Sequence, residues 1–285
     1  MVIKVILALL GGTESDERAL RTAFGLAQLY EAHVEALHVR IDPRTAMPYM
    51  GEGMSGAAIQ EILESAEKDE ESLSGKLQKL FASLCTEGEI PLSDTPSNGV
   101  SAAWVEEIGR EDEIVSRRGR LADLILVGRP GKNDEPSAGL TIETALFESG
   151  RPVMIIPPGP LVQTGRKIAV AWNGSLEATR AVAGAMPVLR RADEVTVFSV
   201  IDKDDGEGPD GLVRYLGWNG VSAQAQTIDS KGRPAGRALL EEVSQWQGDL
   251  LVMGGYTHNR FRQMLFGGVT RHIMTDAPIP VLMTH

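Results

Sequence analysis

The sequence has little of what several protein classes require. It contains a single cysteine, Cys85, in 285 residues, which excludes an internal disulfide and a cysteine-rich metal cage and is typical of a reducing cytoplasm. No apolar run approaches the roughly 20 residues that a membrane-spanning helix needs. Basic residues are also scarce, because 28 Lys and Arg stand against 39 Asp and Glu, a net charge of −11. We therefore expect a cytoplasmic protein with no membrane insertion and no general affinity for nucleic acid.

The chain is long enough for two domains and repeats itself. Its length is about twice the commonest domain size of roughly 150 residues, and 42% hydrophobic and 24% charged residues are ordinary globular values. Three landmarks occur twice in the same order: an apolar run with a Gly/Ser/Thr turn, an Asp-Leu-rich run, and a Pro-led apolar run (4–15 and 167–178, 122–128 and 248–254, 151–156 and 279–283). This repetition predicts a tandem duplication. We expect a first domain at 1–160 and a second at 161–285, joined through a Pro/Gly-rich linker.

Within each half, unbroken apolar runs alternate with segments of helical period. In the second half the expected strands are 167–172, 194–201, 221–227, 249–253 and 281–283, and the expected helices are 175–189, 211–219, 234–247 and 268–276. Continuous apolar strands indicate burial on both faces, and hence a parallel sheet covered by helices. The first half fits the same scheme with a long charged helix, 57–85, inserted after its second strand. The predicted fold class is α/β, with two Rossmann-like five-stranded parallel sheet domains in tandem.

A candidate anion site lies in the second half. In such sheets ligands bind beyond the carboxyl ends of the strands, and Gly267, Gly268 and Thr270 stand where a helix should begin. Backbone amides without a Cβ in front of them suit a phosphate. No acidic residue occurs from Leu250 to Thr275. The glycines fit a simple tight turn equally well, so both interpretations stay open.

The second half resembles a universal stress protein domain. That family's nucleotide loop has Gly, two residues, Gly, nine residues, Gly and then Ser or Thr; here Gly254 is followed by Thr257 and, after nine residues, by Gly267. Thr257 thus replaces the second glycine, and Asn173 replaces the aspartate that usually follows the first strand. The resemblance extends to both halves. It implies a Rossmann-like fold of the adenine nucleotide α-hydrolase-like type, adenine-nucleotide binding in part of the family, and frequent homodimers.

The resemblance also implies a set of nucleotide contacts. Phosphates are expected on the amides of residues 267–270 and adenosine near the ends of the first two strands. The predicted binding residues are Ala171, Asn173, Val200, Gly254, Thr257, Gly267, Gly268, Val269 and Thr270. The first half departs further, because only seven residues separate Gly131 from Gly139 and because Asp134 and Glu135 would repel phosphate. We expect that half to be a nucleotide-free structural copy.

The predicted function is that of a stress-response regulatory protein that binds ATP or a related adenine nucleotide through its second domain. A nucleotide-free scaffold or interaction protein of the same fold and a weak ATPase are the alternatives. Catalytic residues and metal ligands are not predicted: the five histidines form no HExxH motif and no Gly-x-Ser-x-Gly elbow occurs. Cys85 is expected to be a buried thiol, and Trp104 and Trp246 fall on helical patterns.

Overall fold

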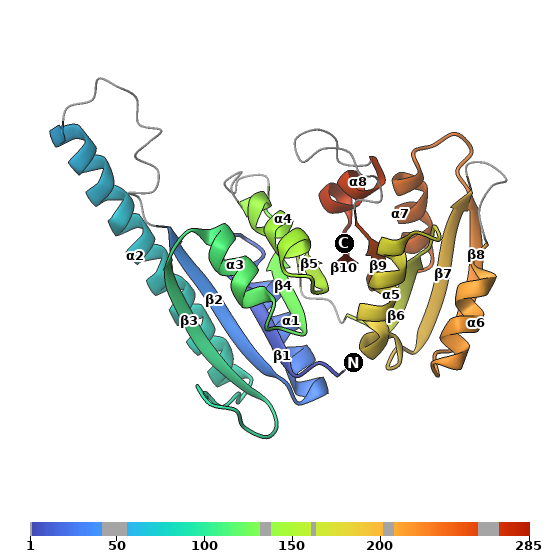
Figure 1. Cartoon of the computed structure of the whole chain (residues 1–285), viewed down its shortest axis with the longest axis horizontal. Coiled ribbons are helices and arrows are strands. Elements are labelled where there is room, and N and C mark those ends of the chain that lie inside the picture. Colours follow the sequence, from blue (N-terminus) through green and yellow to red (C-terminus); the bar gives the residue numbers. More distant parts are fainter. Residues whose placement is uncertain (1, 42–55, 132–137, 161–163, 202–207, 256–267) are drawn as a thin grey trace. The chain divides into compact units, whose positions relative to one another are not determined.

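A computed structural model describes residues 2–41, 56–131, 138–160, 164–201, 208–255 and 268–285. Contacts between residues divide the chain into an N-terminal unit, Lys4–Ser149, and a C-terminal unit, Gly150–His285 together with Met1–Ile3. Figure 1 shows that each unit is a sheet flanked by helices. In the described part of the chain, no helix combines the length and the apolar character that crossing a membrane demands.

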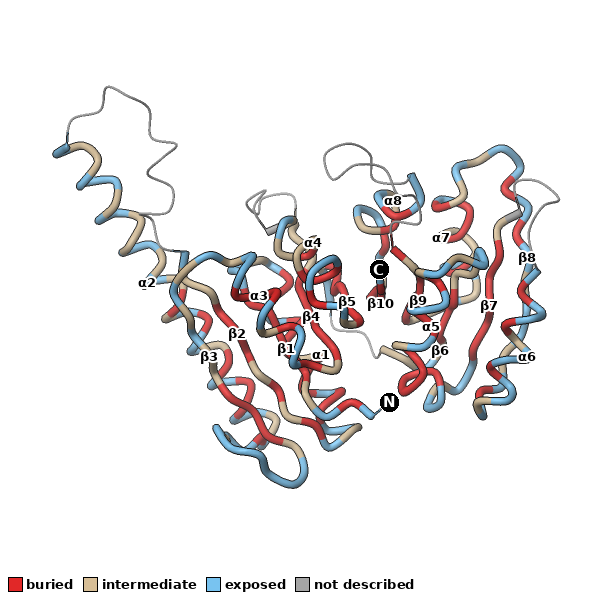
Figure 2. Tube along the Cα trace, viewed as in Figure 1, coloured by how far each residue is buried: buried red, intermediate tan, exposed pale blue. Residues whose placement is uncertain are grey.

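The N-terminal unit has four parallel strands in the order β3-β2-β1-β4. Its elements are β1 Val5–Leu9, α1 Asp16–Tyr30, β2 His33–Ile41, α2 Gly56–Glu87, β3 Ser101–Gly109, α3 Glu111–Gly119, β4 Leu124–Gly128 and α4 Ala138–Glu148. Strands β1 and β4 are almost entirely buried, as the red tubes of Figure 2 show. Their continuous apolar sequences form strands because helices cover both sheet faces.

Helix α2 is the insertion that the sequence predicts after the second strand. It packs on β2 and β3 through its C-terminal half only, where the buried residues are Ser74, Leu77, Phe81, Leu84 and Cys85. The Phe81 ring lies 5.9 Å from that of Trp104 and 6.1 Å from that of Phe24. No residue from 56 to 73 is buried. The N-terminal half of α2 therefore contributes no buried residue to the unit.

The C-terminal unit has the strand order β5-β10-β9-β6-β7-β8. Its elements are β5 Val153–Ile156, β6 Lys167–Ala171, α5 Leu176–Leu189, β7 Glu194–Ile201, α6 Asp210–Trp218, β8 Gln224–Asp229, α7 Ala235–Gln245, β9 Leu250–Gly254, α8 Gly268–Asp276 and β10 Val281–Thr284. The predicted α/β class and the predicted helices and strands are confirmed, except that β8 begins three residues later than expected.

Strand β5 departs from the all-parallel scheme. It pairs antiparallel with β10, with Val281 opposite Ile155 and Met283 opposite Val153. Both strands have four residues and are buried throughout. These are the Pro-led runs that end the two sequence repeats, so equivalent strands of the two copies pair with each other. The domain boundary predicted at residue 160 remains a prediction.

Candidate functional site

The C-terminal unit brings several predicted binding residues to one edge of its sheet. Ala171 ends β6 and Gly254 ends β9, and these parallel neighbours are in register with Val170 opposite Val252. Val200 lies near the end of β7, which pairs with β6 on its other side. Because the strands are parallel, these three residues share the carboxyl edge where ligands of such sheets bind.

Close packing against α5 leaves no room for a side chain at Gly254. A Cβ built on it would lie 2.6 Å from the backbone carbonyl carbon of Glu177 and still closer to the backbone nitrogen of Ala178. These atoms belong to the first turn of α5, so the end of β9 touches the start of that helix. Any side chain at position 254 would push the backbone apart. The close approach also places Gly254 beside the helix start that Ser175 caps.

Asn173 has a local structural role. Its Oδ1 accepts a hydrogen bond of 3.2 Å from the backbone N–H of Ser175, and the Ser175 hydroxyl oxygen accepts one of 3.2 Å from the N–H of Ala178. Ser175 is thus the N-cap of α5. The asparagine supports the turn after β6, as an aspartate would, through an oxygen acceptor.

Helix α8 supplies the remaining described residues of the predicted phosphate site. Gly268 and Val269 are exposed and Thr270 is buried, and no heavy atom of the described residues lies within 4 Å of a Cβ built on Gly268. Thr257 and Gly267 lie outside the described residues, as do Arg260 and Arg262. Nucleotide binding by the nine predicted residues therefore remains a prediction.

His272 of α8 pairs with a residue further along its own helix rather than with the first turn. His272 Nδ1 lies 2.8 Å from Asp276 Oδ2, one turn further along the same helix. Gly236 of α7 lets the two helices approach closely, because a Cβ there would lie 3.2 Å from the backbone of Val269. The start of α8 is consequently fixed by packing against α7 while its first residue, Gly268, stays open.

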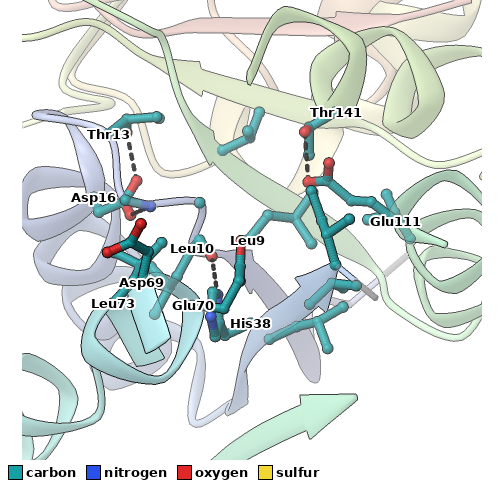
Figure 3. Close-up of a pocket in the computed structure, with 18 residues that line it drawn as sticks. Leu9, Leu10, Thr13, Asp16, His38, Asp69, Glu70, Leu73, Glu111 and Thr141 are labelled. Carbon is teal, nitrogen blue, oxygen red and sulfur yellow. Dashed lines mark hydrogen bonds between the residues drawn. The ribbon is translucent and has the colours of Figure 1, made fainter. Parts of the chain in front are cut away.

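The N-terminal unit contains a cavity at the corresponding edge of its own sheet. The cavity has a volume of about 370 Å³ and lies at the carboxyl ends of β1, β2 and β4. Figure 3 shows side chains of α1 and α2 on one side, Glu111 and Thr141 on the other, and His38 between them. Leucines and valines of β1, β2, α2, α3 and β4 provide an apolar wall. The fold thus builds an amphipathic cavity in the half that the sequence suggests is a structural copy.

His38 is a buried polar residue of this cavity. Its side chain is 2% exposed, and Nδ1 lies 2.9 Å from the carbonyl oxygen of Leu10. A carbonyl only accepts hydrogen bonds, so Nδ1 carries the proton and Nε2 presents a lone pair in the neutral ring. Within the described structure, Nε2 is buried and has no hydrogen-bond partner.

Glu111 is a carboxylic acid of the cavity whose pKa is raised by its surroundings. Burial raises the pKa of its carboxyl, and the nearby Glu70 carboxylate acts in the same direction. The Thr141 hydroxyl opposes this rise by donating a hydrogen bond of 2.6 Å to Oε1. Asp16 differs, because its carboxylate already accepts hydrogen bonds from the Gly12 amide, at 2.7 Å, and from the Thr13 hydroxyl.

Sequence reasoning did not identify this cavity. Its polar residues come from β2, α2, α3 and α4, and no fixed spacing connects positions so far apart. The available signal was the charge difference between the halves: residues 1–160 carry 15 Lys and Arg against 26 Asp and Glu, whereas residues 161–285 carry 13 of each. Such an excess does not by itself say which acids face a cavity.

The architecture defines the class of protein: a two-unit Rossmann-like α/β protein with candidate sites at the carboxyl edges of its sheets. Residues 219–285 match the model of the universal stress protein family. The predicted resemblance to a universal stress protein domain is therefore confirmed for residues 219–285.

Solved structures share the fold over the whole chain. A universal stress protein from Archaeoglobus fulgidus DSM 4304 has 14% identity and a TM-score of 0.68, with 98% of this chain and 97% of that chain covered. A protein of unknown function from Pseudomonas aeruginosa PAO1 has 15% identity and a TM-score of 0.59, with 99% and 92% covered. A putative universal stress protein from Pseudomonas aeruginosa UCBPP-PA14 has 13% identity and a TM-score of 0.54, with 99% and 93% covered. No curated protein matches the sequence.

Proposed function

We propose that the chain is a cytoplasmic, homodimeric stress-response regulatory protein that binds ATP or a related adenine nucleotide through residues 161–285. The family match lies within this region. The observation that carries the proposal is the start of α8, where no atom of the described residues lies within 4 Å of a Cβ built on Gly268. An anion is favoured at such a helix start because the amide N–H groups and the helix dipole both attract negative charge.

The charge of the surrounding sequence supports a phosphate rather than a cation. No acidic residue occurs from Leu250 to Thr275, so the segment that would contact the phosphates brings no carboxylate to repel them. The sequence also has no P-loop lysine after the first strand of this half, and binding would depend on backbone amides and neighbouring Arg or His. Adenosine would lie at the carboxyl edge formed by Ala171 and Val200, beside the Asn173 turn.

Titration calorimetry with ATP tests the proposal through Gly268→Val. Among the described residues, no heavy atom lies within 4 Å of a Cβ built at this position, so we expect the fold to accept valine. Its side chain would occupy the phosphate space, and we expect affinity to fall by at least about tenfold, a loss of about 1.4 kcal/mol. Gly139→Val is the matched control, because Gly139 lies near the start of α4 in the N-terminal unit and also has open space in front of it.

If Gly268→Val binds ATP as well as the parent protein does, the start of α8 is not a phosphate site. The nucleotide-free scaffold would then be the better interpretation. One observation already favours that alternative: Asn173 uses its side-chain oxygen to hold the turn before α5, so this position has a structural role that needs no ligand. Weak ATP hydrolysis is a third candidate, and release of phosphate during the same titrations would detect it.

A further inference from the structure

The cavity of the N-terminal unit has the wrong charge for a nucleotide. Asp69, Glu70 and Glu111 line it together with Asp16, and none of its described lining residues is Lys or Arg. Arg40 follows His38 on β2, but its guanidinium lies 3.4 Å from Glu106 and 3.7 Å from Glu71. That cation is thus engaged outside the cavity lining. A polyphosphate would meet repulsion here, whereas a positive group would be attracted.

His38 is an independent indication of a ligand. A buried polar atom without a hydrogen-bond partner destabilises the folded state, and native structures rarely leave one unpaired. The Nε2 of His38 is such an atom, and its ring lines the cavity. Because Nδ1 donates to Leu10, the partner that Nε2 lacks in the neutral ring is a hydrogen-bond donor.

Two features decide which kind of cation fits. Among the described residues, no three His, Cys, Asp or Glu side chains gather closely enough to hold a metal ion. The cavity also has an apolar wall that includes Leu9, Leu37 and Val127, and it has room for far more than one ion at about 370 Å³. An ammonium group has three N–H donors and no acceptor, which suits a site whose polar groups are carboxylates and an imidazole lone pair.

We propose that this cavity binds a small organic cation, a primary amine with an apolar body. The ammonium group lies between the carboxylates of Glu70 and Glu111 and donates to His38 Nε2, while the hydrocarbon part contacts the leucine and valine wall. The site is separate from the proposed nucleotide site, since every lining residue belongs to the N-terminal unit.

Calorimetry of the full chain with three amines of increasing size tests this proposal. The probes are propylamine, cyclohexylamine and phenethylamine, each paired with the alcohol of the same skeleton. We expect at least one amine to bind, and its alcohol to bind at least about tenfold more weakly. Glu111→Gln keeps an acceptor for Thr141 but removes the charge, and we expect it and Glu70→Gln each to weaken amine binding at least about tenfold. Glu61→Gln, an exposed change on the same helix as Glu70 but outside the cavity, should leave it unchanged.

Indole N–H signals in an NMR spectrum locate the site. The Trp104 ring lies 6.2 Å from the His38 ring, so amine binding should shift its signal and leave that of Trp246, in the other unit, in place. The proposal is overturned if no amine binds, if alcohols bind as well as amines, or if Glu111→Gln and Glu70→Gln bind like the parent. ATP binding that shifts Trp104 would also overturn it. A failure of ATP to bind in the C-terminal unit would leave these outcomes unaffected.

Discussion

The burial of Glu111 makes the stability of the folded chain depend on pH. Burial raises its pKa in the folded chain above the ordinary value of 4.5, so the folded state holds this proton more tightly than the unfolded state does. The associated stability is fully present below the unfolded pKa and is lost as pH rises through the folded pKa. Ionisation of the Glu111 carboxyl at neutral pH therefore lowers the stability of the folded state.

We predict that Glu111→Gln is more stable than the parent at pH 7 and equally stable near pH 4, where the parent carboxyl is protonated. Glutamine retains an oxygen that can accept the Thr141 hydrogen bond, so the change isolates the charge. Urea unfolding at the two pH values measures the difference, and Glu61→Gln should show no comparable effect. A stability difference that is the same at both pH values would contradict the assigned role of burial.

Other single residues show what sequence can and cannot indicate. Cys85 is buried as predicted, and burial raises the pKa of its thiol to about 11. Trp104 was expected on a helix and lies instead on β3, opposite Ala36 of β2. The prediction was wrong because an aromatic among small and acidic residues fits either period over so short a stretch. Trp246 lies at the end of a helix, where it is the C-cap residue of α7.

At the scale of elements, the two halves of helix α2 differ in how far their side chains are buried. Its C-terminal half buries Leu77, Phe81 and Leu84 against the sheet, whereas no residue from 56 to 73 is buried. Helical stability in proteins comes mostly from packing of an apolar face, and local opening is easiest where few apolar contacts are made.

Hydrogen exchange should therefore divide α2 near Ser74. We predict that amides of residues 60–70 exchange at least about tenfold faster than those of residues 78–86. Mass spectrometry of peptic peptides measures both segments in one experiment, and α1 is an internal reference because it is packed along its whole length. Uniform protection along α2 would show that something besides the described contacts holds its first half.

The elements of the C-terminal unit were largely predictable because their apolar runs are long and clearly bounded. Strand β8 was misplaced by three residues since most of its residues are not buried; as an edge strand it offers no continuous apolar run. The antiparallel pairing of β5 with β10 was not predictable, because an apolar sequence carries no information about strand direction. The candidate phosphate loop, inferred from its spacing and from the family resemblance, remains a prediction, and the acidic cavity was missed because its residues are brought together only by the fold.

At the scale of the whole molecule, β5 links the two sequence repeats. By sequence it closes the first repeat, yet it covers the edge strand β10 of the C-terminal unit. A fragment of residues 161–285, which follows the predicted domain boundary, lacks β5 and leaves β10 with an unpaired apolar edge. Exposed edges of this kind promote association between chains.

We predict that residues 150–285 form a more stable and more soluble fragment than residues 161–285. Urea unfolding followed by circular dichroism gives the stability, and sedimentation velocity reports association. The shorter fragment should unfold at lower urea and sediment as larger species. Indistinguishable behaviour of the two fragments would support the boundary at residue 160 and show that β10 needs no partner.

The pairing of β5 with β10 also has a consequence for synthesis on the ribosome. The two strands are about 125 residues apart along the chain, and at about 5–20 residues per second the second is made roughly 6–25 s after the first. Residues 4–149 can complete their own contacts during that interval. The β10-facing edge of β5 meanwhile waits without its partner, so this four-residue strand is the point at which a nascent chain would most need a chaperone.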